Sequence, residues 1–105
     1  ERSLRWNAEI CEQVAYAIAG EQFGVYFALA GEAAHMDLPP LIRVGVEFGA
    51  LTQLVVDRRS RDDRLLSLSD NEQEAMFSRI RGRLDAALDT ADPRLRTQLE
   101  SLFPQ

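Results

Sequence analysis

The 105-residue sequence contains no lysine, so all twelve of its basic side chains are arginine. Without lysine the chain cannot form a Schiff base, and it lacks the lysine that a P-loop uses to bind nucleotide phosphates. It also has one cysteine, Cys11, and one histidine, His35. A single cysteine excludes an internal disulfide and a Cys-x-x-Cys site. No nucleophile-elbow or oxyanion-type glycine loop surrounds Cys11 or His35, so we do not expect one of the common catalytic triads. Cys11 is interpreted as a small apolar residue on a helix.

Long hydrophobic runs are missing as well. No apolar stretch approaches the roughly 18 residues of a membrane-spanning helix, because charged residues interrupt every candidate: Glu21, Glu32, Arg43 and Glu47. There is no leader pattern of basic, apolar and small residues. The formal charge of −5 opposes binding to nucleic acid or to an anionic membrane. We therefore expect a cytoplasmic protein that binds neither.

The composition is that of a globular protein, with 46% hydrophobic and 28% charged residues. Residues 1–105 are enough for a single domain with one core. We expect a single helical domain. Because the sequence begins with Glu1 rather than Met, a fragment or subunit of a larger helical assembly is kept as an alternative.

The strongest pattern lies in residues 41–57. Four of its residues, Gly45, Gly49, Gln53 and Asp57, recur at every fourth position and form one row on a helix. Most other positions are bulky and apolar, which predicts a central helix that is apolar nearly all round. Each interior glycine costs about 1 kcal/mol relative to alanine, so Gly45 and Gly49 indicate that another helix packs closely there. Gln53 and Asp57 would then face a cleft or a partner.

Two helices are predicted before this segment, over residues 4–19 and 21–35, with Gly20 ending the first helix or bending the chain between them. Proline suits the first turn of a helix, so the central helix should begin near Pro39 or Pro40.

Two further helices are predicted after it. Ser69 and Glu72 have the spacing of a capping box, and Asp92 with Pro93 is a helix start signal. No alternating strand pattern occurs. The expected fold is all-α, a bundle of about five helices around a central apolar helix.

Nine residues match the spacing of two helices in a known family. They are Gly24, Phe27, Leu29, Ala30 and Glu32 in one segment, and Gly45, Gly49, Gln53 and Asp57 in the next. These motifs resemble the C-terminal half of the trans-prenyl diphosphate synthases, the polyprenyl synthetase family. In that family, aspartates at the end of the second helix hold Mg²⁺ ions that bind a diphosphate.

The second aspartate-rich motif is degenerate in this sequence. Val56 and Ser60 stand where two of its aspartates would be, which leaves Asp57 alone, and the first aspartate-rich motif is missing. The resemblance therefore implies a catalytically incomplete domain that is a fragment or a partner subunit, with Mg²⁺ as the cofactor. Its implied diphosphate end is Gln53, Asp57 and Arg58, and its implied hydrophobic pocket is bounded by Phe23, Phe27 and Phe48.

Two alternatives remain open. Glu32 and His35, together with Glu21 and Glu47, have the residue types of a ferritin-like metal site, which one histidine per chain allows only after dimerisation. The other alternative is a non-catalytic interaction module that self-associates through the apolar surfaces of its first two helices. All three hypotheses predict a homo- or hetero-oligomer.

Overall fold

The computed structural model describes residues 7–61 and 63–102 of the chain, and every regular element in these ranges is a helix. The elements are α1 (Ala8–Ala15), η1 (Tyr16–Gly20), α2 (Glu21–Ala33), α3 (Leu38–Arg59), α4 (Asp63–Leu66), α5 (Asp70–Asp89) and α6 (Pro93–Leu102). The all-α class is therefore confirmed. Residues 4–6 of the first predicted helix lie outside the described residues.

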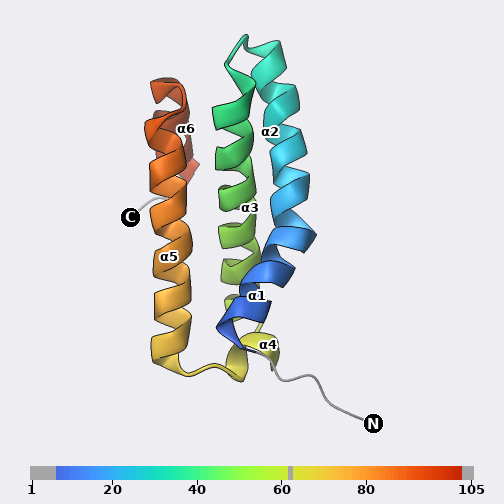
Figure 1. The fold of residues 1–105 in the computed structure, drawn as a ribbon, viewed down its shortest axis with the longest axis vertical. Helices are drawn as coiled ribbons and strands as arrows, with labels where there is room; N and C mark the ends of the chain where they lie inside the picture. The colour runs from blue at the N-terminus through green and yellow to red at the C-terminus, as the bar shows by residue number, and fades with distance from the viewer. Residues whose placement is uncertain (1–6, 62, 103–105) are drawn as a thin grey trace.

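The expected count of about five helices is not confirmed. Residues 8–33 continue through α1, η1 and α2 without a loop, and α4 is a single turn, so four longer helices remain in the described part of the chain. The segment Tyr16–Gly20 is a π-helical turn, and Gly20 and Glu21 keep right-handed helical backbone angles. A π turn fits one extra residue into a helix. Of the two outcomes predicted at Gly20, a helix end or a bend, the structure has the bend (Figure 1).

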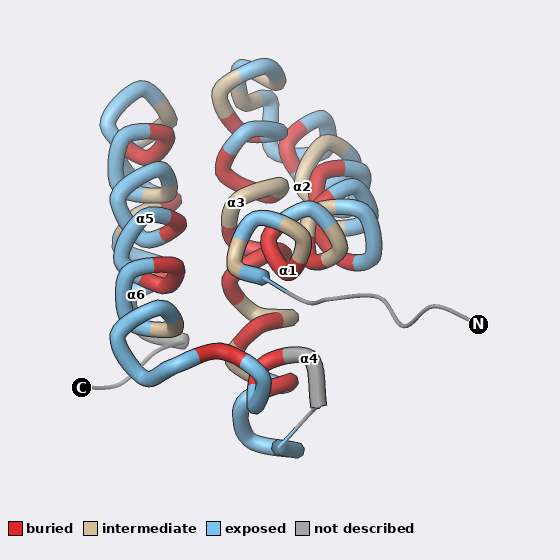
Figure 2. Tube along the Cα trace, turned by 60° about the horizontal axis from the view of Figure 1, so that its bottom comes forward, coloured by how far each residue is buried: buried red, intermediate tan, exposed pale blue. Residues whose placement is uncertain are grey.

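Helix α3 lies between α2 on one side and α5 on the other, and it also packs against α1, η1 and α4 (Figure 1). Buried residues on the flanking helices lie on the sides turned toward α3 (Figure 2). The prediction that α3 is apolar nearly all round is not confirmed, because its exposed surface also carries Arg43, Arg58 and Arg59. No helix in the described ranges is both long enough and apolar enough to span a bilayer.

The predicted close approach at the two glycines of α3 is present. A Cβ atom added to Gly45 would lie 2.6 Å from the carbonyl oxygen of Phe23, and one added to Gly49 would lie 2.6 Å from that of Ala19. Both glycines are buried. The backbones of η1 and α2 therefore occupy the space that a side chain at either position would need.

The glycines on the η1 and α2 side of this contact are closely packed as well. A Cβ atom on Gly20 would lie 3.1 Å from the carbonyl oxygen of Val46, and one on Gly24 would lie 3.0 Å from Val46 Cγ2. Glycines on both helices thus allow the two backbones to lie close together. One side of α2 is therefore covered by α3.

The predicted helix starts are confirmed. The amide of Glu72 donates to Ser69 Oγ at 3.1 Å, and the amide of Ser69 donates to Glu72 Oε1 at 2.8 Å. The amide of Arg94 donates to Asp92 Oδ1 at 2.9 Å at the start of α6. Helix α3 has its prolines in the first turn.

Replacement of Gly49 by alanine tests the α2–α3 contact. We expect Gly49→Ala to lower the free energy of unfolding by about 1–3 kcal/mol, because the new methyl group meets backbone that cannot move aside cheaply. The matched control is Gly82→Ala in α5, where a Cβ atom meets nothing within 4 Å. Gly82→Ala should raise stability by about 0.5–1 kcal/mol through helix propensity. Urea denaturation measures both, and equal effects would contradict the close packing.

Candidate functional site

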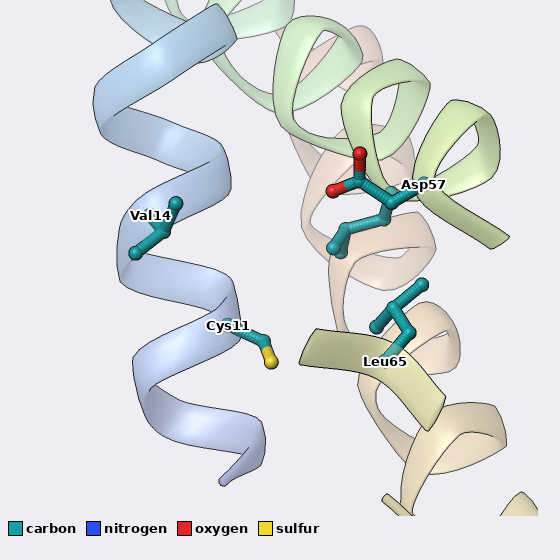
Figure 3. Close-up of a pocket in the computed structure, with 5 residues that line it drawn as sticks. Cys11, Val14, Asp57 and Leu65 are labelled. Atoms are coloured by element: carbon teal, nitrogen blue, oxygen red, sulfur yellow. The ribbon is translucent and has the colours of Figure 1, made fainter. Parts of the chain in front are cut away.

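The polar pair predicted at the end of the glycine row is formed. Gln53 Nε2 donates to Asp57 Oδ1 at 2.9 Å, and Asp57 is buried with 8% of its surface exposed. The Asp57 carboxylate points toward α1 (Figure 3). A small cavity of about 10 Å³ lies there, and it is lined by Cys11, Val14, Leu54, Asp57 and Leu65. Such a volume holds about one water molecule. A diphosphate does not fit in it.

Arg58 does not join this pair. Its guanidinium lies over the ring of Phe77 at 4.1 Å from the centroid, and its Nη1 lies 3.3 Å from Glu74 Oε2. Successive residues on an α-helix point about 100° apart, so Arg58 turns toward α5 while Asp57 turns toward α1. Of the three residues predicted for the diphosphate end, the structure brings two together.

The three phenylalanines predicted to bound a hydrophobic pocket meet between α2 and α3. The ring centroids of Phe23 and Phe48 are 5.6 Å apart, and those of Phe27 and Phe48 are 5.8 Å apart. At these distances the rings pack against one another. They therefore fill the helix interface instead of surrounding an open tunnel.

Two grooves lie beside these rings, and Leu99 of α6 lines both. One of about 370 Å³ is lined by Phe27 and Leu41 among others, and one of about 380 Å³ is lined by Phe48 and Thr52 among others. These volumes are at the lower end of the range for small-molecule sites. The second groove is bordered by two arginines and two acidic residues, Arg81, Asp85, Arg96 and Glu100.

The residues of the ferritin-like alternative are not gathered in this chain. No group of three or more His, Cys, Asp or Glu residues in the described ranges could hold a metal ion. Glu21 and Glu32 lie near opposite ends of α2, roughly 16 Å apart along its axis. Glu47 accepts a hydrogen bond from Tyr16 instead.

His35 ends α2 in a structural role. It has a left-handed backbone with φ of 59°, and its amide donates to the carbonyl oxygen of Glu32 at 3.2 Å. The amide of Met36 donates to the carbonyl oxygen of Gly31 at 2.8 Å, which completes a Schellman motif. His35 is exposed at this helix C-terminus.

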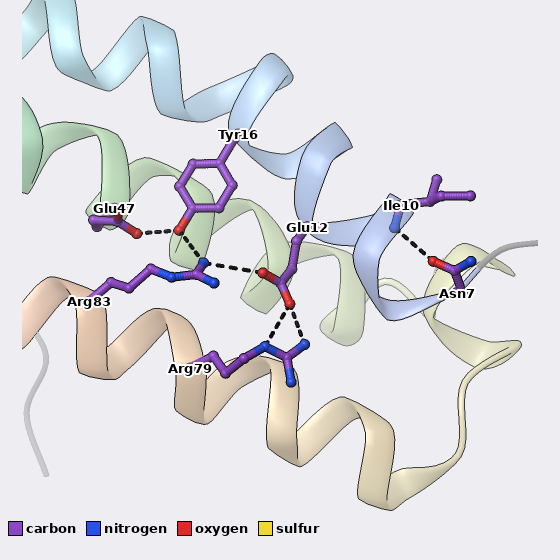
Figure 4. A network of polar contacts seen from close by, with 7 residues as sticks. All are labelled: Asn7, Ile10, Glu12, Tyr16, Glu47, Arg79 and Arg83. Carbon is purple, nitrogen blue, oxygen red and sulfur yellow. Dashed lines mark hydrogen bonds and ion pairs between the residues drawn. The ribbon is translucent and has the colours of Figure 1, made fainter.

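A polar network that the sequence did not predict joins three parts of the fold (Figure 4). Glu12, which is 9% exposed, accepts from Arg79 Nε at 3.0 Å and from Arg83 Nη1 at 3.2 Å. Arg83 Nη1 also lies 3.0 Å from the hydroxyl oxygen of Tyr16, and that hydroxyl donates to Glu47. The network fastens α1 and η1 to both α3 and α5.

The network links the helices and favours the protonated form of the Tyr16 phenol. Burial raises the pKa of Tyr16 to about 12, helped by its hydrogen bond with Glu47 and opposed by Arg83. A phenol that keeps its proton so far above neutral pH is a poor general base. The sequence does contain a signal: Glu12 with Tyr16 and Arg79 with Arg83 are both spaced by four. Only the packing of α1 on α5 shows that they meet.

Comparison with protein-family models, with curated proteins and with solved structures finds no match to this chain. The resemblance to the trans-prenyl diphosphate synthases therefore depends on the nine matching residues alone and stays a prediction.

The raised pKa of Tyr16 predicts a pH dependence. In the unfolded chain the phenol loses its proton near pH 10.0, whereas in the folded chain it does so near 12. Between these values the unfolded chain binds fewer protons, so stability falls as pH rises through this window. Tyr16→Phe should make that fall shallower, as measured by urea denaturation across the range. The wild-type chain is the reference, and a Tyr16→Phe variant that keeps the wild-type slope would contradict the assignment.

Thr52 supplies a second prediction, because its Oγ1 is enclosed and has no hydrogen-bond partner in the described part of the chain. Thr52→Val should raise the free energy of unfolding by about 1–2 kcal/mol by removing a hydroxyl that loses water without replacement. In the control Thr90→Val, the lost hydroxyl donates to the carbonyl oxygen of Ala87 at 2.9 Å. That variant should lose about 1 kcal/mol. Thermal denaturation measures the change in stability of both variants. A change in the same direction for both would contradict this account.

Proposed function

We propose that this chain is a non-catalytic helical interaction module that self-associates through the outward face of η1 and α2. The observation that carries the proposal is a set of large apolar side chains exposed on one side of this helix. Ile18 is 49% exposed, Val25 58%, Tyr26 56% and Leu29 64%. We call these four residues, together with the exposed Gln22 among them, the α2 face.

The α2 face is continuous because its members are three or four residues apart along the helix. The opposite side of α2 carries Gly24 and Gly31, which are buried against α3. Helix α2 also lies at the edge of the bundle, on the side of α3 away from α5 (Figure 1). Its outward side is therefore open to a partner.

Exposed apolar side chains that occur singly need no explanation, whereas a contiguous apolar patch marks an interaction surface. Association would remove this patch from water at a gain of about 25 cal/mol per Å² of apolar surface. The network around Glu12 offers no activated group that would support an enzymatic function instead.

The other two hypotheses have less support. The close packing at Gly45 and Gly49 is compatible with a prenyl-synthase-like scaffold, but the enclosed Asp57 does not favour binding of Mg²⁺ and a diphosphate. A ferritin-like site would need a second chain to bring its ligands together.

Light scattering during gel filtration tests the proposal. The wild-type chain should elute as an oligomer, and Leu29→Glu should weaken self-association by roughly 100-fold, or about 2.7 kcal/mol, because it places a charge inside the apolar contact. Leu66→Glu is the matched control, since Leu66 is 53% exposed and lies on α4 outside the α2 face. A wild-type chain that stays monomeric at all concentrations would overturn the proposal, as would equal effects of the two variants.

A further inference from the structure

We propose that two copies of this chain pair through their α2 helices in parallel and in register, so that Gln22 of one copy binds Gln22 of the other. This inference rests on the proposed function and adds the orientation, the register and the polar contact that select a second copy as the partner.

The spacing of the α2 face is that of a two-stranded seam. Ile18, Gln22, Val25 and Leu29 are separated by four, three and four residues, which is the alternation of a and d positions in a coiled coil. Glu32 continues the same spacing. Its carboxylates would face each other across the pair, so the apolar part of the seam ends at Leu29.

Gln22 lies at the centre of this surface. Three of the exposed apolar residues, Ile18, Val25 and Tyr26, are its neighbours on the helix surface, and Leu29 lies one turn further along the same face. A partner that covers these residues also removes the Gln22 amide from water. A primary amide has two N–H donors and one acceptor oxygen, and leaving them without partners in a buried contact is costly. The partner must therefore be apolar around the edge and offer both a donor and an acceptor at the centre.

A second copy of the chain meets this requirement. In a parallel, in-register pair each seam residue faces its own counterpart, so the carbonyl oxygen of each Gln22 can accept from the amide nitrogen of the other. A two-fold interface places the same patch of both subunits in contact. A single polar residue at an a position is a known way to fix register and the number of strands.

The residues beside the seam favour parallel over antiparallel pairing. Glu21 and Tyr26 occupy the two opposite edges of the seam, at g and e positions. In a parallel pair the g residue of one helix lies beside the e residue of the following turn of the other. The hydroxyl of Tyr26 can then donate to the carboxylate of Glu21 in the second copy. An antiparallel pair with Ile18 facing Leu29 would instead place Gln22 against Val25, and the Gln22 amide would be buried without a hydrogen-bond partner.

Disulfide crosslinking tests the orientation. Gln22→Cys and Leu29→Cys should each form a covalent dimer with itself on mild oxidation, because a disulfide needs Cα atoms closer than about 7 Å. Leu66→Cys is the control and should not crosslink. Native Cys11 is 3% exposed and stays in place in all variants. An equal mixture of Ile18→Cys and Leu29→Cys chains should give no mixed dimer, since these positions lie at opposite ends of a parallel seam.

The outcomes separate this inference from the proposed function. A mixed Ile18–Leu29 dimer without self-crosslinking would show an antiparallel pair, and the orientation proposed here would be overturned while self-association through α2 stands. A monomer at all concentrations would overturn both.

The role of Gln22 has its own test. Gln22→Glu should weaken the dimer at least about tenfold at neutral pH, and acidification should restore it, because two carboxylates would meet in the seam. Gln98→Glu makes the same change on α6 and should leave the dimer intact. If Gln22→Glu has no effect, Gln22 does not lie in the contact and the proposal is overturned.

Discussion

The structure depends on one contact, in which η1 and α2 lie against α3 with backbone nearly touching backbone. The carbonyl groups of Phe23 and Ala19 occupy the positions that side chains at Gly45 and Gly49 would need. Because the glycines hold one side of α2 against α3, the bulky side chains on the opposite side of α2 point away from the bundle. Glycine packing on one side and an apolar outward face on the other are therefore two consequences of the same arrangement.

The second constraint is the polar network that holds α1 and η1 in place. The glycine contact fixes α2 along α3, whereas α1, which precedes the π turn, packs on the core through Cys11 and Ala15 and has a further, polar attachment. Glu12 supplies it by accepting hydrogen bonds from two arginines of α5. Arginine suits this task because its planar guanidinium can bind a carboxylate and a phenol at once, and it stays charged when partly buried. Removal of both arginines would leave the buried carboxylate of Glu12 without a compensating charge.

Much of the fold could be predicted because its signals are local. The capping box at Ser69 and the proline-containing first turn of α3 depend on neighbours within a few residues, and the glycine row depends only on helical periodicity. The enclosure of Asp57 could not be predicted, since it depends on where α1 lies. The separation of Arg58 from Asp57 could have been, because adjacent helix positions always diverge. The network around Glu12 needed the packing of α1 on α5, which no local pattern reveals.

One hypothesis from the sequence is self-association through the apolar surfaces of the first two helices, and the large exposed apolar residues of this segment lie on one side of it. A helix that is apolar on both sides normally has both sides covered. In the described chain α3 covers one side of α2, and the proposed partner would cover the other. An apolar partner alone would leave the Gln22 amide buried without hydrogen bonds, whereas a second copy places an identical amide opposite it. The single polar residue in the patch thus argues for a copy of the same chain more strongly than the apolar residues do.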